Sequence, residues 1–181
     1  MVNINLAYSA PINPSGASPI LSEAQIWDGL RRKVRKAHEF VAPILECEVL
    51  SEEDIASGTK VTRQVVFDKD ARGSNDSVVK EVVYEFAPTR VDFYQPDGSK
   101  IFNIVSVDQE GNLMMTYAFE WRHPGVEAEG EQAKELRDKY FKVSLTFPFY
   151  ILETDMISQM AKGAVEGTIT TIRKLVKEGE L

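Results

Sequence analysis

The sequence predicts an α+β domain in which seven antiparallel strands form a curved sheet that packs against helices. Between Cys47 and Arg122, apolar and polar residues alternate with a period of two, and turn-forming residues interrupt this pattern at short intervals. The predicted strands lie near 46–53, 59–69, 77–86, 90–95, 100–108 and 112–122. Short turns favour antiparallel neighbours, and a sheet of seven twisted strands bends around what it buries.

One further strand, which is the first in chain order, and two short helices are expected before this region. Residues 3–11 alternate apolar and polar side chains and end at Pro11, which predicts the first strand. Ser22 and Gln25 have the spacing of a capping box, and apolar residues then recur at helical intervals to about His38. We expect the basic run at 31–36 to form a solvated helix face, and an anion-binding or membrane-binding patch is the alternative. Residues 40–45, which are apolar and contain Pro43, predict a second brief helix.

The C-terminal third contains two helical patterns, Glu131–Lys142 and Met160–Lys177, separated by a segment rich in β-forming residues. If Lys142 is joined directly to Met160, one stripe contains Leu136, Tyr140, Met160, Ala161, Ala164, Thr168, Ile172 and Leu175. Residues Val143–Gln159 are therefore interpreted either as an insertion into one helix, translated from a retained intron, or as a lid-like loop before a shorter terminal helix. Gly163 and Gly167 predict close approach of this helix to the sheet or a ligand, or loose local packing.

Composition limits the classes of function. The 181 residues fit one domain, and the net charge of −7 argues against a nucleic-acid-binding surface. A single cysteine, Cys47, excludes an internal disulfide, and with only two histidines a zinc site or a cysteine nucleophile is not expected. No stretch has the length and apolar character of a membrane span or a signal peptide, so we expect a cytoplasmic protein.

The strand at 113–122 gives the strongest indication of a binding site. Its alternate residues share one face of the sheet, and they are Leu113, Met115, Tyr117, Phe119 and Trp121. Aromatic rings and methionine form a surface that adapts to an apolar guest. Ordinary core packing also explains this stripe and is the simpler interpretation, because most apolar stripes only pack, while a binding site remains the alternative.

Polar candidates lie on apolar strand faces. Asn103 and Tyr117 are expected to present an amide and a hydroxyl inward, where buried polar groups need hydrogen-bond partners. Arg63 and Glu81 lie on neighbouring strands, either as a cross-strand ion pair or with Glu81 as an inward general acid or base. Trp27 is interpreted as a ligand contact or a core anchor. The sequence contains no phosphate-binding loop, nucleophile elbow or metal-ligand cluster, and we expect no cofactor.

The order of elements resembles the helix-grip fold of the START and Bet v 1-like ligand-binding superfamily. Specific segments sharpen this resemblance to the mostly fungal family of proteins similar to the acetylaranotin-cluster protein L. These segments are APINP at 10–14, QIWDGL at 25–30, PTRVDF at 88–93, LMMTYAFEWR at 113–122 and AVEGTI at 164–169, with Ile172, Arg173 and Lys177–Gly179. The resemblance covers nearly the whole chain except Val143–Gln159.

The resemblance implies a single domain over 1–181 with a cavity between the sheet and the C-terminal helix. It implies that the cavity binds a small hydrophobic metabolite of fungal secondary metabolism, such as mycotoxin biosynthesis. The expected ligand contacts are Trp27, Arg63, Glu81, Asn103, Met115, Tyr117, Phe119 and Trp121. Superfamily members include carriers, sensors and polyketide cyclases, and fold alone does not choose among them.

Three functions are compatible with these residues. The first is metabolite binding, and the second is cofactor-independent cyclisation, dehydration or isomerisation of a pathway intermediate. The third is an interaction module that uses the apolar segment Leu145–Leu152. The sequence leaves the ligand, any catalysed reaction and the oligomeric state open.

Overall fold

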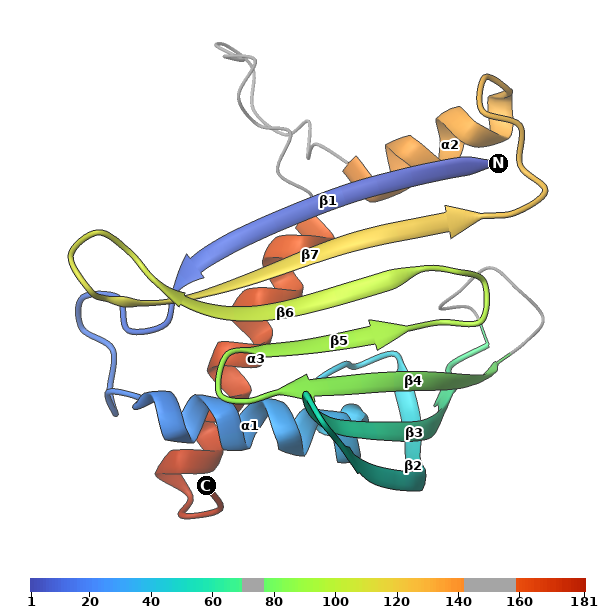
Figure 1. The fold of residues 1–181 in the computed structure, drawn as a ribbon. Helices are drawn as coiled ribbons and strands as arrows, with labels where there is room; N and C mark the ends of the chain where they lie inside the picture. Colours follow the sequence, from blue (N-terminus) through green and yellow to red (C-terminus); the bar gives the residue numbers. More distant parts are fainter. Residues whose placement is uncertain (70–76, 142–158) are drawn as a thin grey trace, which may run out of the picture.

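A computed structural model describes residues 1–69, 77–141 and 159–181, which form seven strands and three α-helices with one short 3₁₀ turn (Figure 1). The strands are β1 (Val2–Pro11), β2 (Ile44–Ile55), β3 (Gly58–Phe67), β4 (Val78–Phe86), β5 (Arg90–Tyr94), β6 (Lys100–Val107) and β7 (Leu113–His123). The helical elements are α1 (Glu23–Arg35), the 3₁₀ turn η1 (Ala37–Glu39), α2 (Glu131–Phe141) and α3 (Gln159–Lys177).

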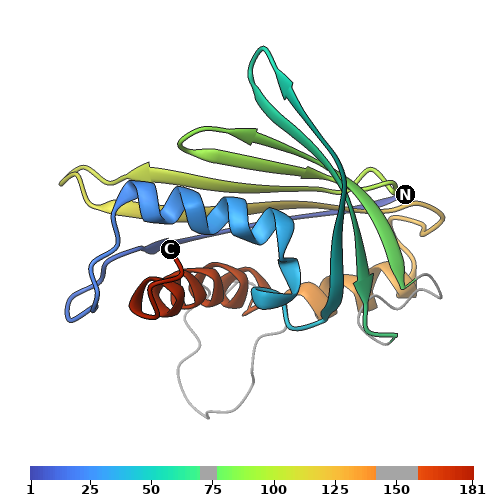
Figure 2. The same cartoon turned by 90° about the horizontal axis from the view of Figure 1, so that it is seen from below.

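The seven strands form one antiparallel sheet in the order β1-β7-β6-β5-β4-β3-β2. The first and last of the described strands, β1 and β7, pair with each other, from Val2 opposite His123 to Pro11 opposite Met114. The other neighbours are consecutive in sequence, as the short turns predicted. All described helices lie on one face of the curved sheet (Figure 2), and we call this its inner face. The predicted helix-grip arrangement is confirmed.

Helix α1 begins with the predicted capping box. The Ser22 hydroxyl accepts a hydrogen bond from the Gln25 backbone N–H at 3.3 Å, and the Gln25 side-chain oxygen accepts one from the Ser22 N–H at 3.0 Å. The helix buries Gly29 against α3. A Cβ atom at Gly29 would lie 2.5 Å from Cγ1 of Ile172, so the missing side chain permits the close approach of the two helices.

The prediction of a second helix at 40–45 is wrong in position. The helical turn lies earlier, at Ala37–Glu39, and Ile44 already pairs with Phe67 in β2. Lys36 has a φ of −134°, which ends α1 at Arg35 instead of at His38. Pro43 disfavours helical geometry in the residue before it, and its carbonyl accepts a hydrogen bond from the Asp68 N–H at 2.9 Å. The apolar run therefore leads into the sheet.

The C-terminal helices pack on the inner face. Ala133 of α2 and Ala161, Val165 and Ile172 of α3 belong to the same core as β1 and β7. Gly163 and Gly167 are exposed, and no described atom lies within 4 Å of a Cβ built at either, so the predicted close approach is wrong. The predicted insertion lies outside the described residues except for Gln159, the first residue of α3.

Candidate functional site

The aromatic stripe on β7 lies on the inner face, as expected. Met115, Tyr117 and Phe119 are 0%, 1% and 7% exposed and belong to the main hydrophobic core. The Tyr117 and Phe119 rings are 6.3 Å apart between centroids, and the rings of Phe119 and Trp121 stack at 5.7 Å. Trp27 is half-buried at the margin of this core. The stripe is therefore largely packed against other side chains.

Four polar side chains meet inside this apolar environment, and we call them the Lys33 cluster: Lys33 of α1, Asn103 of β6, Tyr117 of β7 and Thr168 of α3. The Lys33 amine donates hydrogen bonds to the Tyr117 hydroxyl at 3.0 Å and to Thr168 Oγ1 at 3.4 Å. It also lies 4.3 Å from the centroid of the Tyr117 ring. The buried Lys33 amine thus connects α1 to β7 and α3.

The helical period of α1 places Lys33 in this position. Ile26, Leu30 and Lys33 follow the i, i+4, i+7 spacing of one helix face, and the first two are fully buried. Lys33 is only 8% exposed, so the expectation that the whole basic run is solvated is wrong for this residue. The i, i+4, i+7 spacing of Ile26, Leu30 and Lys33 can be read from the sequence alone. Thr168 lay on the predicted apolar stripe of α3 and is 1% exposed.

Asn103 is fully buried and lies opposite Tyr117 in the pairing of β6 with β7. Neither its amide nitrogen nor its oxygen makes a hydrogen bond of ordinary geometry with a described residue. Burial raises the pKa of the Tyr117 hydroxyl, while proximity to Thr168 and to the misaligned Asn103 amide opposes that rise. The hydroxyl therefore stays protonated, and the amide keeps capacity for a further partner.

Arg63 and Glu81 form the predicted cross-strand ion pair, buried beside the cluster. The guanidinium donates to Glu81 Oε2 at 2.9 and 2.7 Å and to the carbonyl oxygens of Lys33 and Val34 at 3.0 and 2.8 Å. Gln95 Nε2 donates to the other Glu81 oxygen at 2.8 Å. Both carboxylate oxygens are thus engaged, which argues against Glu81 as a free general base.

The electrostatic environment favours the neutral form of the Lys33 amine. Burial and, to a smaller extent, the positive charge of Arg63 together lower the pKa of Lys33 to about 7, and this value includes an opposing effect of Glu81. An amine with this pKa is partly neutral at physiological pH. Together with the hydroxyl of Tyr117, it provides a proton acceptor and a proton donor within one hydrogen bond of each other.

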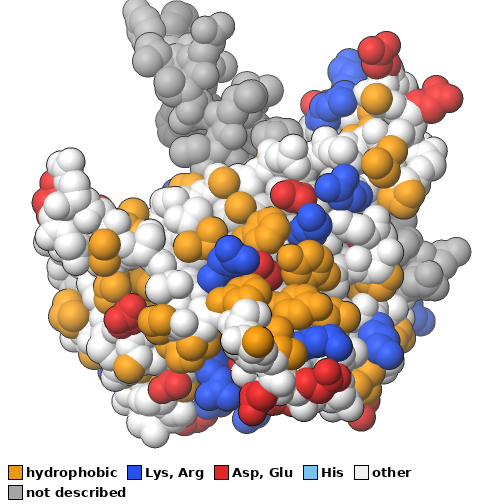
Figure 3. Space-filling model, in the orientation of Figure 1, with side chains coloured by type: hydrophobic (Ala, Val, Ile, Leu, Met, Phe, Trp, Pro, Cys, Tyr) orange, Lys and Arg blue, Asp and Glu red, His pale blue; other side chains and the backbone are white. Residues whose placement is uncertain are grey.

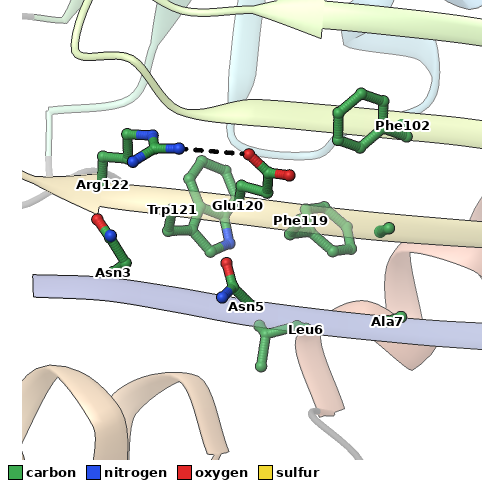
Figure 4. Close-up of a pocket in the computed structure, with 10 residues that line it drawn as sticks. Asn3, Asn5, Leu6, Ala7, Phe102, Phe119, Glu120, Trp121 and Arg122 are labelled. Atoms are coloured by element: carbon green, nitrogen blue, oxygen red, sulfur yellow. Dashed lines mark hydrogen bonds and ion pairs between the residues drawn. The ribbon is translucent and has the colours of Figure 1, made fainter.

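The outer face of the sheet carries two depressions, each with a volume of about 520 Å³. Hydrophobic side chains lie among charged ones on this face (Figure 3). One depression is lined by Asn3, Asn5, Leu6, Ala7, Phe102, Ala118, Phe119, Glu120, Trp121 and Arg122 (Figure 4). The other is lined by Ile55, Ser57, Val82, Tyr84, Phe86 and Tyr94. Neither depression includes the Lys33 cluster, so neither is the cavity expected between the sheet and α3.

Among residues 1–69, 77–141 and 159–181, no three His, Cys, Asp or Glu side chains are close enough together to hold a metal ion. Cys47 has a free thiol and contacts the Val34 carbonyl oxygen at 3.6 Å. In the same ranges, no helix has the length and apolar character needed to cross a membrane.

Comparison with solved structures supports the fold. The Zhui aromatase/cyclase from Streptomyces sp. R1128 is 10% identical, with 97% of this chain and 96% of that chain covered and a TM-score of 0.58. A Staphylococcus aureus protein of unknown function is 9% identical, with 98% and 97% covered and a TM-score of 0.53. At this identity, the similarity shows the fold alone.

Sequence comparison identifies the family. The Acetylaranotin biosynthesis cluster protein L of Aspergillus terreus (strain NIH 2624 / FGSC A1156) is 27% identical over 177 residues, which cover 98% of this chain and 92% of the relative. The family model described as Acetylaranotin biosynthesis cluster protein L matches residues 6–147. Since that match spans well over half of the chain, the protein belongs to the acetylaranotin biosynthesis cluster protein L family.

Proposed function

We propose that this protein binds a small hydrophobic metabolite between the sheet and α3. We place this role in fungal secondary metabolism and propose that the protein is cytoplasmic. The observation that carries the proposal is the Asn103 amide, which is fully buried and lacks a hydrogen-bond partner of ordinary geometry among the described residues. An unsatisfied buried amide costs about 1–3 kcal/mol, and a ligand oxygen or N–H at this position would offset that cost.

The surroundings of Asn103 support an apolar ligand with few polar groups. Val105, Met115 and Phe119 contribute apolar surface on the same face of the sheet, and Tyr117 adds one hydroxyl. Binding sites for small molecules combine such apolar walls with a few placed polar groups. Because Asn103 and Tyr117 are at most 1% exposed, a ligand reaches them only when neighbouring side chains move apart.

Names of similar proteins agree with this role. The Aspergillus terreus relative is named for a biosynthesis cluster, and the Streptomyces protein of the same fold is named an aromatase/cyclase. The second name supports a second candidate function, namely cofactor-independent cyclisation, dehydration or isomerisation of a pathway intermediate. The contact between Lys33 and Tyr117 favours this candidate, because proton transfer needs adjacent donor and acceptor groups.

The test begins with native mass spectrometry of the protein purified from its own cells, which identifies the metabolite that co-purifies. The recovered compound is then titrated against Asn103→Ala and Tyr117→Phe. A binding protein loses affinity by about tenfold in each variant, since each loses about one hydrogen bond. A catalyst instead loses turnover of the compound and retains its affinity.

Ser106→Ala is the matched control, because Ser106 lies on the same strand as Asn103 and is exposed on the outer face. Its affinity for the metabolite is expected to equal that of the unmodified protein. The proposal fails if no small molecule co-purifies, or if Asn103→Ala and Ser106→Ala bind the recovered compound equally well.

A further inference from the structure

We propose that Lys33 is a nucleophile whose amine forms an imine with a ligand that carries an aldehyde or ketone. The inference rests on the proposed function, since it names the chemical class of the ligand held between the sheet and α3. It is carried by the geometry of four buried groups, namely the Lys33 amine, the Tyr117 hydroxyl, the Thr168 hydroxyl and the Asn103 amide.

Within the part of the chain that the structure describes, Lys33 forms no ion pair. The Glu81 carboxylate acts on Lys33 electrostatically, but its two oxygens are engaged by Arg63 and Gln95. A buried ammonium without a counter-ion is costly, so the protein favours the neutral amine.

The neutral amine is the form that attacks carbonyl carbons. Lysines become nucleophilic when they are desolvated in an apolar pocket or placed next to another cation. Lys33 meets both conditions, because it is 8% exposed and Arg63 acts on it as a like charge. Its pKa of about 7 means that a large fraction is neutral at physiological pH, whereas an ordinary lysine is almost fully protonated.

The polar neighbours of Lys33 are suited to stabilising the carbonyl oxygen of a ligand. Tyr117 and Thr168 present hydroxyls at 3.0 and 3.4 Å from the amine, and Asn103 adds an amide that lacks a partner of ordinary geometry in the described chain. A hydroxyl or an amide N–H stabilises the negative charge that develops on an oxygen during attack. Tyr117 stays protonated for this purpose because burial raises its pKa.

The reaction balances without an oxidant or reductant. The nitrogen lone pair forms a bond to the carbonyl carbon, and the π electrons move to the oxygen. Tyr117 takes one proton from the nitrogen as it gives its own to the oxygen, which leaves a neutral carbinolamine. The nitrogen lone pair then expels the hydroxyl group, and the proton that the nitrogen loses converts it to water. The products are one imine and one water molecule.

The test uses the full chain and benzaldehyde as the probe, with sodium cyanoborohydride to trap any imine as a stable benzylamine. The reaction is run at about pH 7, and the labelled lysines are located by peptide mass spectrometry. Lys33 is expected to be labelled at least about tenfold more than Lys174, because the Lys174 side chain is 71% exposed and lacks the desolvation that makes a lysine nucleophilic. Equal or lower labelling of Lys33 overturns the inference.

Two variants test the role of the hydroxyl. Tyr117→Phe is expected to slow labelling of Lys33 by at least about tenfold, since a positioned proton donor is lost. Tyr94→Phe removes a partly exposed tyrosine on the outer face and is expected to leave labelling unchanged. If both variants label at the unmodified rate, the proposed proton transfer is overturned.

Binding of the native metabolite is measured separately from labelling of Lys33. If the native metabolite co-purifies while Lys33 is not labelled, the nucleophile is overturned and the proposed binding function stands. If Lys33→Met still holds the metabolite but no longer retains it after borohydride treatment and denaturation, the covalent bond through Lys33 is supported. If no metabolite co-purifies with the unmodified protein, the proposed function fails by its own test.

Discussion

Lys33 is buried by its position on α1, although lysine side chains are usually exposed to water. Its position on the buried stripe of α1 leaves it 8% exposed, with hydroxyls instead of a carboxylate as its hydrogen-bond partners. The cost of protonating it inside the protein appears as a lowered pKa. That cost makes the stability of the fold depend on pH.

We predict that the free energy of unfolding rises with pH between about 7 and 10.5 through Lys33. In this interval the unfolded chain binds a proton on Lys33, with its ordinary pKa of 10.5, and the folded protein does not. The slope from this residue approaches about 1.4 kcal/mol per pH unit and vanishes below both pKa values. Urea unfolding of the unmodified protein and Lys33→Met across this range gives the slope by difference.

Lys174→Met provides the control for this experiment, because the Lys174 side chain is 71% exposed. Its unfolding free energy is expected to follow the same pH profile as the unmodified protein. Parallel profiles for Lys33→Met and the unmodified protein would contradict a depressed Lys33 pKa.

At the scale of elements, the contact between α1 and α3 depends on the absence of a side chain at Gly29. A Cβ atom there would lie 2.5 Å from Cγ1 and 2.7 Å from Cδ1 of Ile172, which is itself fully buried. Both distances are shorter than van der Waals contact, so either Ile172 or the helix must shift. This contact also fixes the distance between Lys33 on one helix and Thr168 on the other.

We predict that Gly29→Ala lowers the free energy of unfolding by about 1–3 kcal/mol, the usual cost of overpacking a core. Gly167→Ala on α3 is the matched control, since the position is exposed and has no described atom within 4 Å. It is expected to raise stability by about 0.5–1 kcal/mol through helix propensity. Equal stability of the two variants in urea unfolding would exclude close packing at Gly29.

The elements themselves were largely predictable from sequence. Each strand was expected within a few residues of its observed bounds, because alternation and turn residues act locally. The helix expected at 40–45 is wrong because a short apolar run fits a helix and a strand equally well. In the structure Ile44 pairs with Phe67, so the run leads into β2. The close approach predicted at Gly163 and Gly167 is wrong because both residues lie beside the predicted apolar stripe of α3, and the stripe is the part of the helix that is buried.

At the scale of the whole molecule, the topology and the inward direction of Asn103 and Tyr117 were predictable, but the site was not. The Lys33 cluster joins α1, β6, β7 and α3, and no local pattern indicates which residues from four elements meet. The spacing of Lys33 after Ile26 and Leu30 was the one available signal. The expected ligand roles of Trp27, Met115, Phe119 and Trp121 stay predictions.

We propose that Val143–Gln159 is an insertion into one helical region of a single domain, and the alternative is a lid-like loop before a shorter terminal helix. The helices on either side, α2 and α3, bury Ala133 and Ala161 in one core. A protein in which Lys142 is joined to Met160 is therefore expected to unfold at the same or a higher temperature, with a larger circular dichroism signal per residue at the helical minimum. A lower unfolding temperature would contradict the proposal, and sequencing of mature transcripts tests its retained-intron form.

The pairing of β1 with β7 has a consequence for biosynthesis. Strand β1 leaves the ribosome before the other described strands, but its sheet partner, β7, is the last of the seven described strands to emerge. Until then, Ile4 and Leu6 remain without the β7 backbone beside them, and the chain must close its longest loop before the sheet is complete. Such non-local pairing slows folding to about milliseconds to seconds and exposes an unpaired strand to aggregation. We therefore expect the sheet to be completed only after β7 has been translated, with chaperones protecting β1 until then.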